Sequence, residues 1–208
     1  MKKPVRLPAR LACLAVLGAC LLSCSTTPES SLFSLEPETV PATTDGPESI
    51  RIEVGPFSMP ELVDHQYIVT RVSASAYTVH QNAGWNEPLG DAVHRVLTTN
   101  LDNRLNDVVA VSHADENEGE FDYRIGGEIS RFDSDENGEV ILIARWTIHD
   151  EKRNAYLSPR NVNYKDRANN PANSGQVARA MNRLLNEFSA DIAEQLSQSL
   201  PETPSQNF

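Results

Sequence analysis

The placement of the cysteines is the feature that most constrains this chain. All three, Cys13, Cys20 and Cys24, lie within the first 24 residues. The rest of the chain therefore has to fold without a disulfide bond, a cysteine-ligated metal or a catalytic thiol. It depends on a hydrophobic core instead, and about 180 residues are enough for one core of ordinary size but not comfortably for two domains.

The cysteines belong to a segment with the features of a bacterial export signal. A basic stretch, Met1–Arg10, precedes the apolar run Leu11–Leu22. That run is shorter than the roughly 20 residues needed to cross a bilayer, so it is typical of a secretory signal. It ends in Leu21-Leu22-Ser23-Cys24, which matches the lipobox of bacterial lipoproteins, where the cysteine thiol accepts diacylglycerol before cleavage. We therefore expect a lipoprotein signal peptide over residues 1–23 and lipidation of Cys24.

Two alternatives remain open for this segment. Leu17-Gly18-Ala19-Cys20 is an overlapping lipobox, but cleavage there would leave two leucines at the start of the mature chain, so we favour Cys24 over Cys20. An ordinary signal peptide that happens to contain a cysteine is the other. The residue after Cys24 is Ser25 and not Asp, and in bacteria that sort lipoproteins by this position the absence of Asp permits export. The expected location is therefore the periplasmic face of the outer membrane.

Acidic side chains dominate the mature chain. Removing residues 1–23 takes away four basic side chains and no acidic ones, which changes the formal net charge from −11 to −15. Such a surface repels phosphate groups, so it argues against a nucleic-acid partner and against electrostatic docking on anionic lipids.

Composition divides the mature chain into three parts. Residues 24–48 are rich in Ser, Thr, Pro and Glu, which predicts a flexible tether. Within it, Leu32-Phe33-Ser34-Leu35 is strand-like and suited to docking on the domain. Residues 49–200 form one folded domain, and residues 201–208 are a polar tail that we expect to be disordered.

Alternating apolar and polar residues predict about six strands in the domain. They cover residues 50–54, 67–72, 76–80, 108–111, 121–129 and 140–148, with a weaker strand over 155–164. Asn137-Gly138 between the last two main strands is a hairpin signal.

Two other segments have helical periodicity. Gly84–Pro88 starts the first helix, with a buried stripe from Leu89 to Leu105, and the second runs over residues 173–200. The fold class that follows is α/β, a single layered sandwich of about six strands and two main amphipathic helices, with helices over at least one sheet face.

The segment from Asp133 to Gly138 matches the first half of a calcium-binding EF-hand loop. The twelfth position of such a loop is a bidentate Glu, but here it is Ala144, and strands rather than helices flank the segment. An acidic hairpin turn is the better interpretation, with weak calcium binding as the alternative. We predict no metal site.

Motifs for catalysis are weak. Asp91 and His94 are spaced to meet on the first helix, but no third member of a catalytic set is apparent. Gly126-Gly127 does not complete a dinucleotide-binding motif and indicates a bulge or a close backbone approach. No Walker A run, nucleophile elbow or paired metal spacing is present. The sequence therefore predicts neither an enzyme nor a cofactor.

Trp85, Pro88 and Leu89 are the candidate partner-binding residues. A tryptophan just before a helix either closes that helix onto the core, which we favour, or presents an aromatic anchor to a partner.

An ordered set of segments extends over essentially the whole mature chain. It comprises Cys24, Phe33-Ser34-Leu35, the strand at 50–54 leading to Pro60-Glu61-Leu62, Ile68-Val69, a Ser-rich turn with Tyr77, Trp85-x-x-Pro88-Leu89, Asn100-Leu101, the hairpin and the long C-terminal helix. In this order the chain resembles the PqiC-type family of ABC-transport auxiliary lipoproteins, also described as membrane integrity-associated transporter subunits. The family more often has Tyr where this chain has Phe33.

The resemblance implies an outer-membrane-anchored accessory protein that works beside an ABC transporter or MCE-domain protein, in lipid transport between membranes or in envelope integrity. It also implies Rossmann-like layering, is compatible with a ring-like homo-oligomer, and transfers no catalytic residue. A stand-alone lipid- or solute-binding lipoprotein is the alternative, and would require a sizeable apolar pocket. A periplasmic hydrolase would require a clustered Ser/His/Asp set or a metal site.

Overall fold

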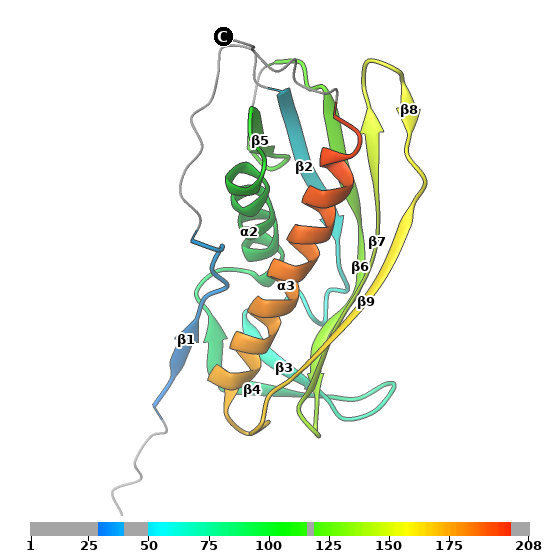
Figure 1. The fold of residues 1–208 in the computed structure, drawn as a ribbon. Coiled ribbons are helices and arrows are strands. Elements are labelled where there is room, and N and C mark those ends of the chain that lie inside the picture. Colours follow the sequence, from blue (N-terminus) through cyan, green and yellow to red (C-terminus); the bar gives the residue numbers. More distant parts are fainter. Residues whose placement is uncertain (1–28, 40–49, 116–118, 201–208) are drawn as a thin grey trace, which may run out of the picture.

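The computed structural model describes residues 29–39, 50–115 and 119–200; the predicted signal peptide, Cys24 and the tail 201–208 lie outside these ranges. Within them the chain forms nine strands and two helices (Figure 1). In chain order these are β1 Ser31–Phe33, β2 Ile50–Ser58, β3 Tyr67–Arg71, β4 Tyr77–Trp85, α2 Leu89–Arg104, β5 Val108–Ser112, β6 Tyr123–Asp135, β7 Glu139–Asp150, β8 Ala155–Tyr156, β9 Arg160–Arg167 and α3 Ser174–Ser197.

The long strand β6 is the centre of the sheet. One of its edges pairs antiparallel with β7, which continues to β8 and β9. Its other edge pairs in parallel with two strands in succession, first β2, where Ile52 lies opposite Tyr123, and then β3, where Thr70 lies opposite Ser134. β5 extends the sheet beyond β2, while β4 and then β1 extend it beyond β3.

Both helices lie side by side on one face of the sheet (Figure 1). α2 packs on β2 and β5, whereas α3 packs on β7 and β9. Rossmann-like layering, which places helices on both faces, is therefore not observed in the described residues. The reason is topological: β7 pairs antiparallel with β6 and also with β8 and β9, and antiparallel strands need no crossover helix on the second face.

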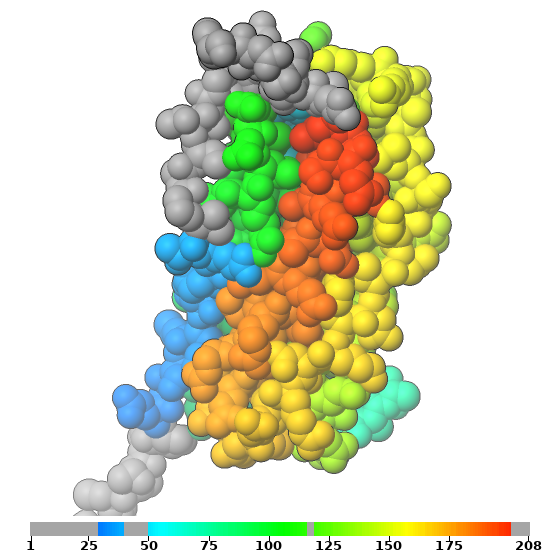
Figure 2. Space-filling view, viewed as in Figure 1, coloured from blue at the N-terminus to red at the C-terminus, as the bar shows by residue number. Residues whose placement is uncertain are grey.

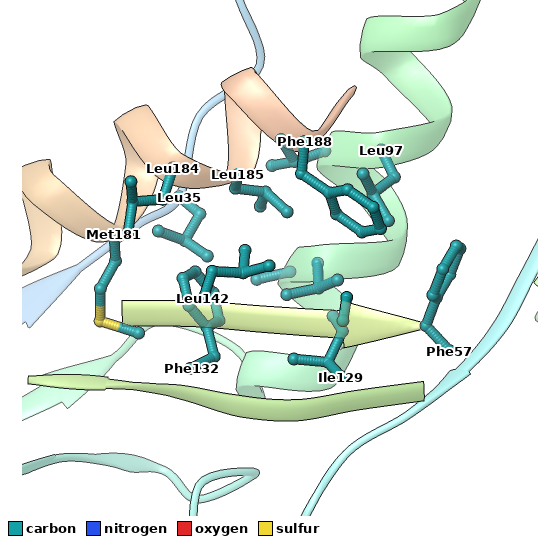
Figure 3. Packing of buried hydrophobic residues seen from close by; sticks show 14 of the residues in the cluster. Leu35, Phe57, Leu97, Ile129, Phe132, Leu142, Met181, Leu184, Leu185 and Phe188 are labelled. Carbon is teal, nitrogen blue, oxygen red and sulfur yellow. The ribbon is translucent and has the colours of Figure 1, made fainter. Parts of the chain in front are cut away.

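The core fills the space between the helices and the sheet. The apolar stripes predicted for the two helices are buried, and they meet alternate residues of β2, β6 and β7. Figure 3 shows Phe188, Leu184 and Leu185 of α3 above Leu142 of β7, with Leu35 from the N-terminal segment in the same layer. The predicted helical period of 3.6 residues and strand period of two residues thus place the apolar side chains in one continuous core.

The structure corrects the strand count and some boundaries. Nine strands replace about six because β1 and β8 are very short and the weak strand at 155–164 divides into β8 and the polar β9. Gly84 and Trp85 end β4 and do not begin the first helix, which starts at Leu89 with Pro88 as its N-cap. The hairpin predicted at Asn137-Gly138 is confirmed, and Gly138 has a φ of 81° that favours glycine.

The molecule is elongated and has two distinct ends (Figures 1 and 2). The described chain begins at one end, beside the β3–β4 hairpin and the loop that precedes α3. The β7–β8 connection and the last turn of α3 lie at the opposite end. Neither helix in the described part of the chain is both long and apolar enough to span a membrane.

Candidate functional site

Residues 31–38, here called the attachment segment, form the first part of the candidate site. β1 adds to the edge of β4 in parallel, with Ser31 opposite Ala83 and Phe33 opposite Trp85. The N–H of Asn86 donates to the carbonyl of Phe33 at 2.9 Å, which continues the pairing past the end of β4. The strand-like segment in the predicted tether thus docks on the domain.

Leu35 fixes the middle of the attachment segment. Its side chain is 0% exposed within the core. Its carbonyl accepts a hydrogen bond from Nη2 of Arg95 at 2.7 Å, and the same nitrogen donates to Oε1 of Glu87 at 2.6 Å. The hydrogen bond from Arg95 to Glu87 raises the pKa of Arg95, so the guanidinium keeps its charge.

Asn100 binds the end of the attachment segment. This residue of α2 is fully buried, and its Oδ1 accepts the N–H of Glu38 at 2.8 Å. Its Nδ2 donates to Asn186 at 2.8 Å and to Ser189 at 3.0 Å, both on α3. One side chain therefore joins both helices to the N-terminal segment. Arg104 adds an ion pair with Glu38.

The attachment segment shortens the stretch that separates the domain from Cys24. Residues 31–38 were assigned by composition to a tether of residues 24–48, but they lie on the domain through the contacts described above. Only residues 25–30 stand between Cys24 and β1. Cys24 itself lies outside the described residues.

Of the three candidate partner-binding residues, Trp85 and Leu89 are buried in the core and only Pro88 is exposed. They secure the start of α2, where Trp85 donates its main-chain N–H to Gln66. Oδ1 of Asp64 accepts the N–H of Gly90 at 2.8 Å, which satisfies a free donor of the first helical turn. This arrangement agrees with the favoured interpretation of the motif as a helix closure.

Asp91 and His94 lie beside a cavity of about 400 Å³ between α2 and the end of β5. Nε2 of His94 accepts the main-chain N–H of Phe57 at 2.9 Å, so the imidazole is neutral with its proton on Nδ1. Burial lowers the pKa of His94, which keeps it in this form. The histidine therefore holds the backbone of β2 against α2.

The acidic motif at Asp133–Gly138 lies in the hairpin between β6 and β7. Asp133 is buried and accepts from Arg71 at 2.7 Å and from Arg131 at 2.8 Å. Oδ1 of Asp135 accepts two main-chain N–H groups of the turn, each at 2.9 Å. These carboxylates are engaged by donors of the protein, which supports the hairpin interpretation. No cluster of metal ligands is found in the described ranges.

The face of the sheet opposite the helices carries a shallow apolar groove of about 250 Å³. Gly126, Gly127, Thr147 and Pro159 line it. A Cβ atom on Gly127 would lie 2.1 Å from the carbonyl oxygen of Arg145, and one on Gly126 would lie 3.1 Å from that of Pro56. The close backbone approach predicted for this glycine pair is confirmed.

An exposed aromatic residue lies close to this groove. Tyr156 is 73% exposed, and its ring lies 4.3 Å from the ring of His149. His149 and Thr147 are on the same face of β7, because side chains alternate along a strand. The sequence indicated only a weak strand here. Tyr156 lies between a turn that contains Asn154 and one that contains Pro159, so it belongs to no periodic apolar pattern.

A chain of charges continues from the groove across the same face. Arg124 pairs with Glu53 at 2.6 Å and with Glu151 at 2.7 Å. His149 also contacts Glu151 at 2.9 Å, and the hydrogen bonds from His149 and Arg124 lower the pKa of Glu151. The helix-free face thus combines an apolar groove, an exposed tyrosine and a fixed charge pattern, which are features of protein-binding surfaces.

A cavity of about 730 Å³ opens between β1, β4 and the start of α3. Its lining is mostly amide, hydroxyl and imidazole side chains, among them His80, Gln81, Asn82 and Asn173. A lipid chain requires an apolar lining, so this cavity does not support a lipid-binding role.

These features define a two-layer α/β domain with a fixed N-terminal strand and an open sheet face. The model of the family described as the ABC-type transport auxiliary lipoprotein component matches residues 33–193. The chain belongs to this family, in agreement with its PqiC-type resemblance. The match begins within the attachment segment, and the family description indicates an accessory role in transport.

Solved structures share the fold. The crystal structure of an uncharacterized protein has a TM-score of 0.66 and 15% sequence identity, covering 81% of this chain and 99% of that one. Protein XCC0632 from Xanthomonas campestris has a TM-score of 0.63 and 16% identity, covering 82% of this chain and 100% of that one. Among curated proteins, none matches the chain.

Proposed function

We propose that the chain is an accessory lipoprotein of an ABC transport system of the MCE type, anchored by acylated Cys24 in the outer membrane and facing the periplasm. In this role it supports lipid transport between the membranes, or envelope integrity, by docking on a protein partner. The observation that carries the proposal is the match of the auxiliary-lipoprotein family over residues 33–193.

The short connection from Cys24 to the domain supports membrane anchoring. Several acyl chains on one cysteine give stable attachment, since each buried CH₂ contributes about 0.8 kcal/mol. Attachment at β1 leaves the opposite end of the molecule, with Tyr156 and the apolar groove, directed away from the anchor. We propose that this surface binds the transporter subunit, because a partner inserted in the inner membrane approaches from the side away from the anchor.

The experiment that tests this role is affinity purification from detergent-solubilised envelopes. The tagged wild-type chain is expected to recover an MCE-domain or permease subunit, whereas Cys24→Ala is expected to fractionate as a soluble protein and recover little of it. Tyr156→Ser is expected to remain in the membrane and lose the partner. Recovery of no transporter component by the wild-type chain would count against the proposal.

The proposal includes a possible homo-oligomer, and the edge of the sheet restricts which surface could form it. The outer edge of β9 carries exposed Arg160, Lys165 and Arg167, and charged edges disfavour pairing between sheets. A homo-oligomer would therefore form through other surfaces. Light scattering of the full chain in detergent measures the number of subunits.

A further inference from the structure

The end of the molecule at which the chain enters, here called the attachment end, consists of β1, the β3–β4 hairpin and the loop 168–173. β1 pairs with β4, and β4 pairs with β3, so these strands form one continuous part of the sheet. Figure 1 shows the loop before α3 at the same end. The pairing of β1 with β4 attaches the start of the described chain to this end, and Leu35 and Glu38 continue the attachment along α2.

The covalent connection limits how far this end lies from the anchor. Seven Cα–Cα steps separate Cys24 from Ser31, which span at most about 25 Å when fully extended. α3 alone is about 36 Å long and runs from the attachment end to the opposite end. The bilayer that holds the acyl chains is therefore nearest to the attachment end.

The attachment end carries most of the exposed large hydrophobic side chains of the described residues, beside the polar cavity between β1, β4 and the start of α3. Five large hydrophobic side chains are exposed in the described residues, and three of them lie here: Leu32 at 72%, Val72 at 42% and Val79 at 40%. Leu32 is on β1, Val79 is on β4, and Val72 is in the turn between β3 and β4. Moving such side chains out of water lowers the free energy.

Two loops of the attachment end are uncharged. The loops Ser73–Ala76 and Ala168–Gly175 contain no charged residue. The β6–β7 turn contributes acidic groups at this end: Asp135 is engaged by two main-chain N–H groups, whereas Glu136 is exposed. At the opposite end the acidic residues Asp122 and Glu151 are ion-paired, with Lys152 and with Arg124.

We propose that the attachment end rests on the lipid bilayer, with Leu32, Val72 and Val79 entering the boundary between head groups and acyl chains. The proposal rests on lipidation of Cys24, which is part of the proposed function. It orients the domain, so that α3 points away from the membrane and presents the opposite end to the periplasm. The bilayer contact is apolar, which agrees with the weak electrostatic attraction expected for an acidic chain.

The test uses the full acylated lipoprotein in vesicles of phosphatidylethanolamine and phosphatidylglycerol. In the mature chain the sulfur of Cys24 is in a thioether, so one introduced cysteine is the sole free thiol. An environment-sensitive fluorophore is attached at Leu32→Cys, Val72→Cys or Val79→Cys, with Tyr156→Cys as the matched exposed control. All four positions are exposed, so the fold is expected to be retained, and circular dichroism verifies this.

We expect blue-shifted emission and at least a two-fold loss of fluorescence with spin-labelled lipids at the three attachment-end positions, and neither at residue 156. Equal, water-like emission at all four positions would overturn the proposal. A blue shift that depends on protein concentration and is insensitive to quenching by lipids would also overturn it, because a second copy then covers the patch. Vesicle flotation and the mass of the N-terminal peptide show whether the chain is acylated and anchored. An acylated chain that floats with the vesicles but whose fluorophore is not quenched refutes the bilayer contact and leaves the anchor intact.

Discussion

The main-chain N–H of Glu38 donates to Oδ1 of Asn100, so a fully buried side chain of α2 recognises the backbone of the N-terminal segment. The same amide also reaches α3 through Asn186 and Ser189. Three parts of the chain that are distant in sequence therefore depend on one polar side chain. A buried amide in this position specifies the arrangement of the two helices as well as the place of the attachment segment.

Asn100→Leu is expected to lower the free energy of unfolding by about 1–3 kcal/mol, because it leaves buried polar groups without partners. Urea denaturation measures this. Asn103→Leu on the same helix is the control: Asn103 is half-buried, and its substitution is expected to change stability by about 0.5 kcal/mol or less. Equal losses in the two variants would contradict the role given to Asn100.

Leu35→Ala is expected to lower the free energy of unfolding by about 2–5 kcal/mol, because it opens a cavity in the core. Leu32→Ala, three residues earlier, removes a mostly exposed side chain and is expected to change stability by about 0.5 kcal/mol or less. Thermal or urea denaturation compares the two. A neutral effect of both substitutions would show that residues 31–38 belong to a loose tether after all.

Much of the fold follows from local patterns. The stripe from Leu89 to Leu105, the long second helix and the hairpin at Asn137-Gly138 are predictable because periodicity and turn chemistry are local signals. β9 is not predictable in the same way, since its alternate residues are charged or amide side chains that lie at an edge. The pairing of β2 and β3 with one edge of β6 is a long-range choice that no local pattern specifies.

The site was less predictable than the fold. Lipidation of Cys24 stays a prediction from a linear motif, whereas the docking suggested by the strand-like Leu32–Leu35 is seen in the pairing of β1 with β4 and the burial of Leu35. For Trp85 the favoured interpretation is closure of the helix onto the core, and the residue is buried at the end of β4 beside the capping contact of Asp64. Tyr156 gave no signal, because exposure of a side chain is decided by tertiary structure.

Gly127→Ala is expected to destabilise the protein strongly, by about 3 kcal/mol or more, because the added methyl group overlaps the carbonyl of Arg145 and the strands have to separate. Gly126→Ala meets the carbonyl of Pro56 at a longer distance and is expected to cost less. Denaturation of both variants ranks them, and the opposite order would show that β6 and β7 adjust more readily than the geometry indicates.

Stability is expected to depend on pH through His94. Because burial lowers its pKa in the folded protein, the unfolded chain takes up a proton first as the pH falls below 6.5. The free energy of unfolding then decreases toward low pH and is fully retained above pH 6.5. His94→Gln keeps an acceptor for Phe57 without the titration, so denaturation at pH 5.5 and 7.5 should show a smaller difference than in the wild type. An unchanged difference would exclude His94 as the cause.

The central claim is that the domain is held at one end by its lipid anchor and docks on a transport subunit through the other. Photo-cross-linking in native envelopes tests it most directly, with a photoreactive amino acid at position 156 or at position 32 of the full chain. We predict that the probe at Tyr156 captures an MCE-domain subunit of an ABC transport system and that the probe at Leu32 does not. Capture of no transport subunit from position 156, or equal capture from both positions, would contradict the account.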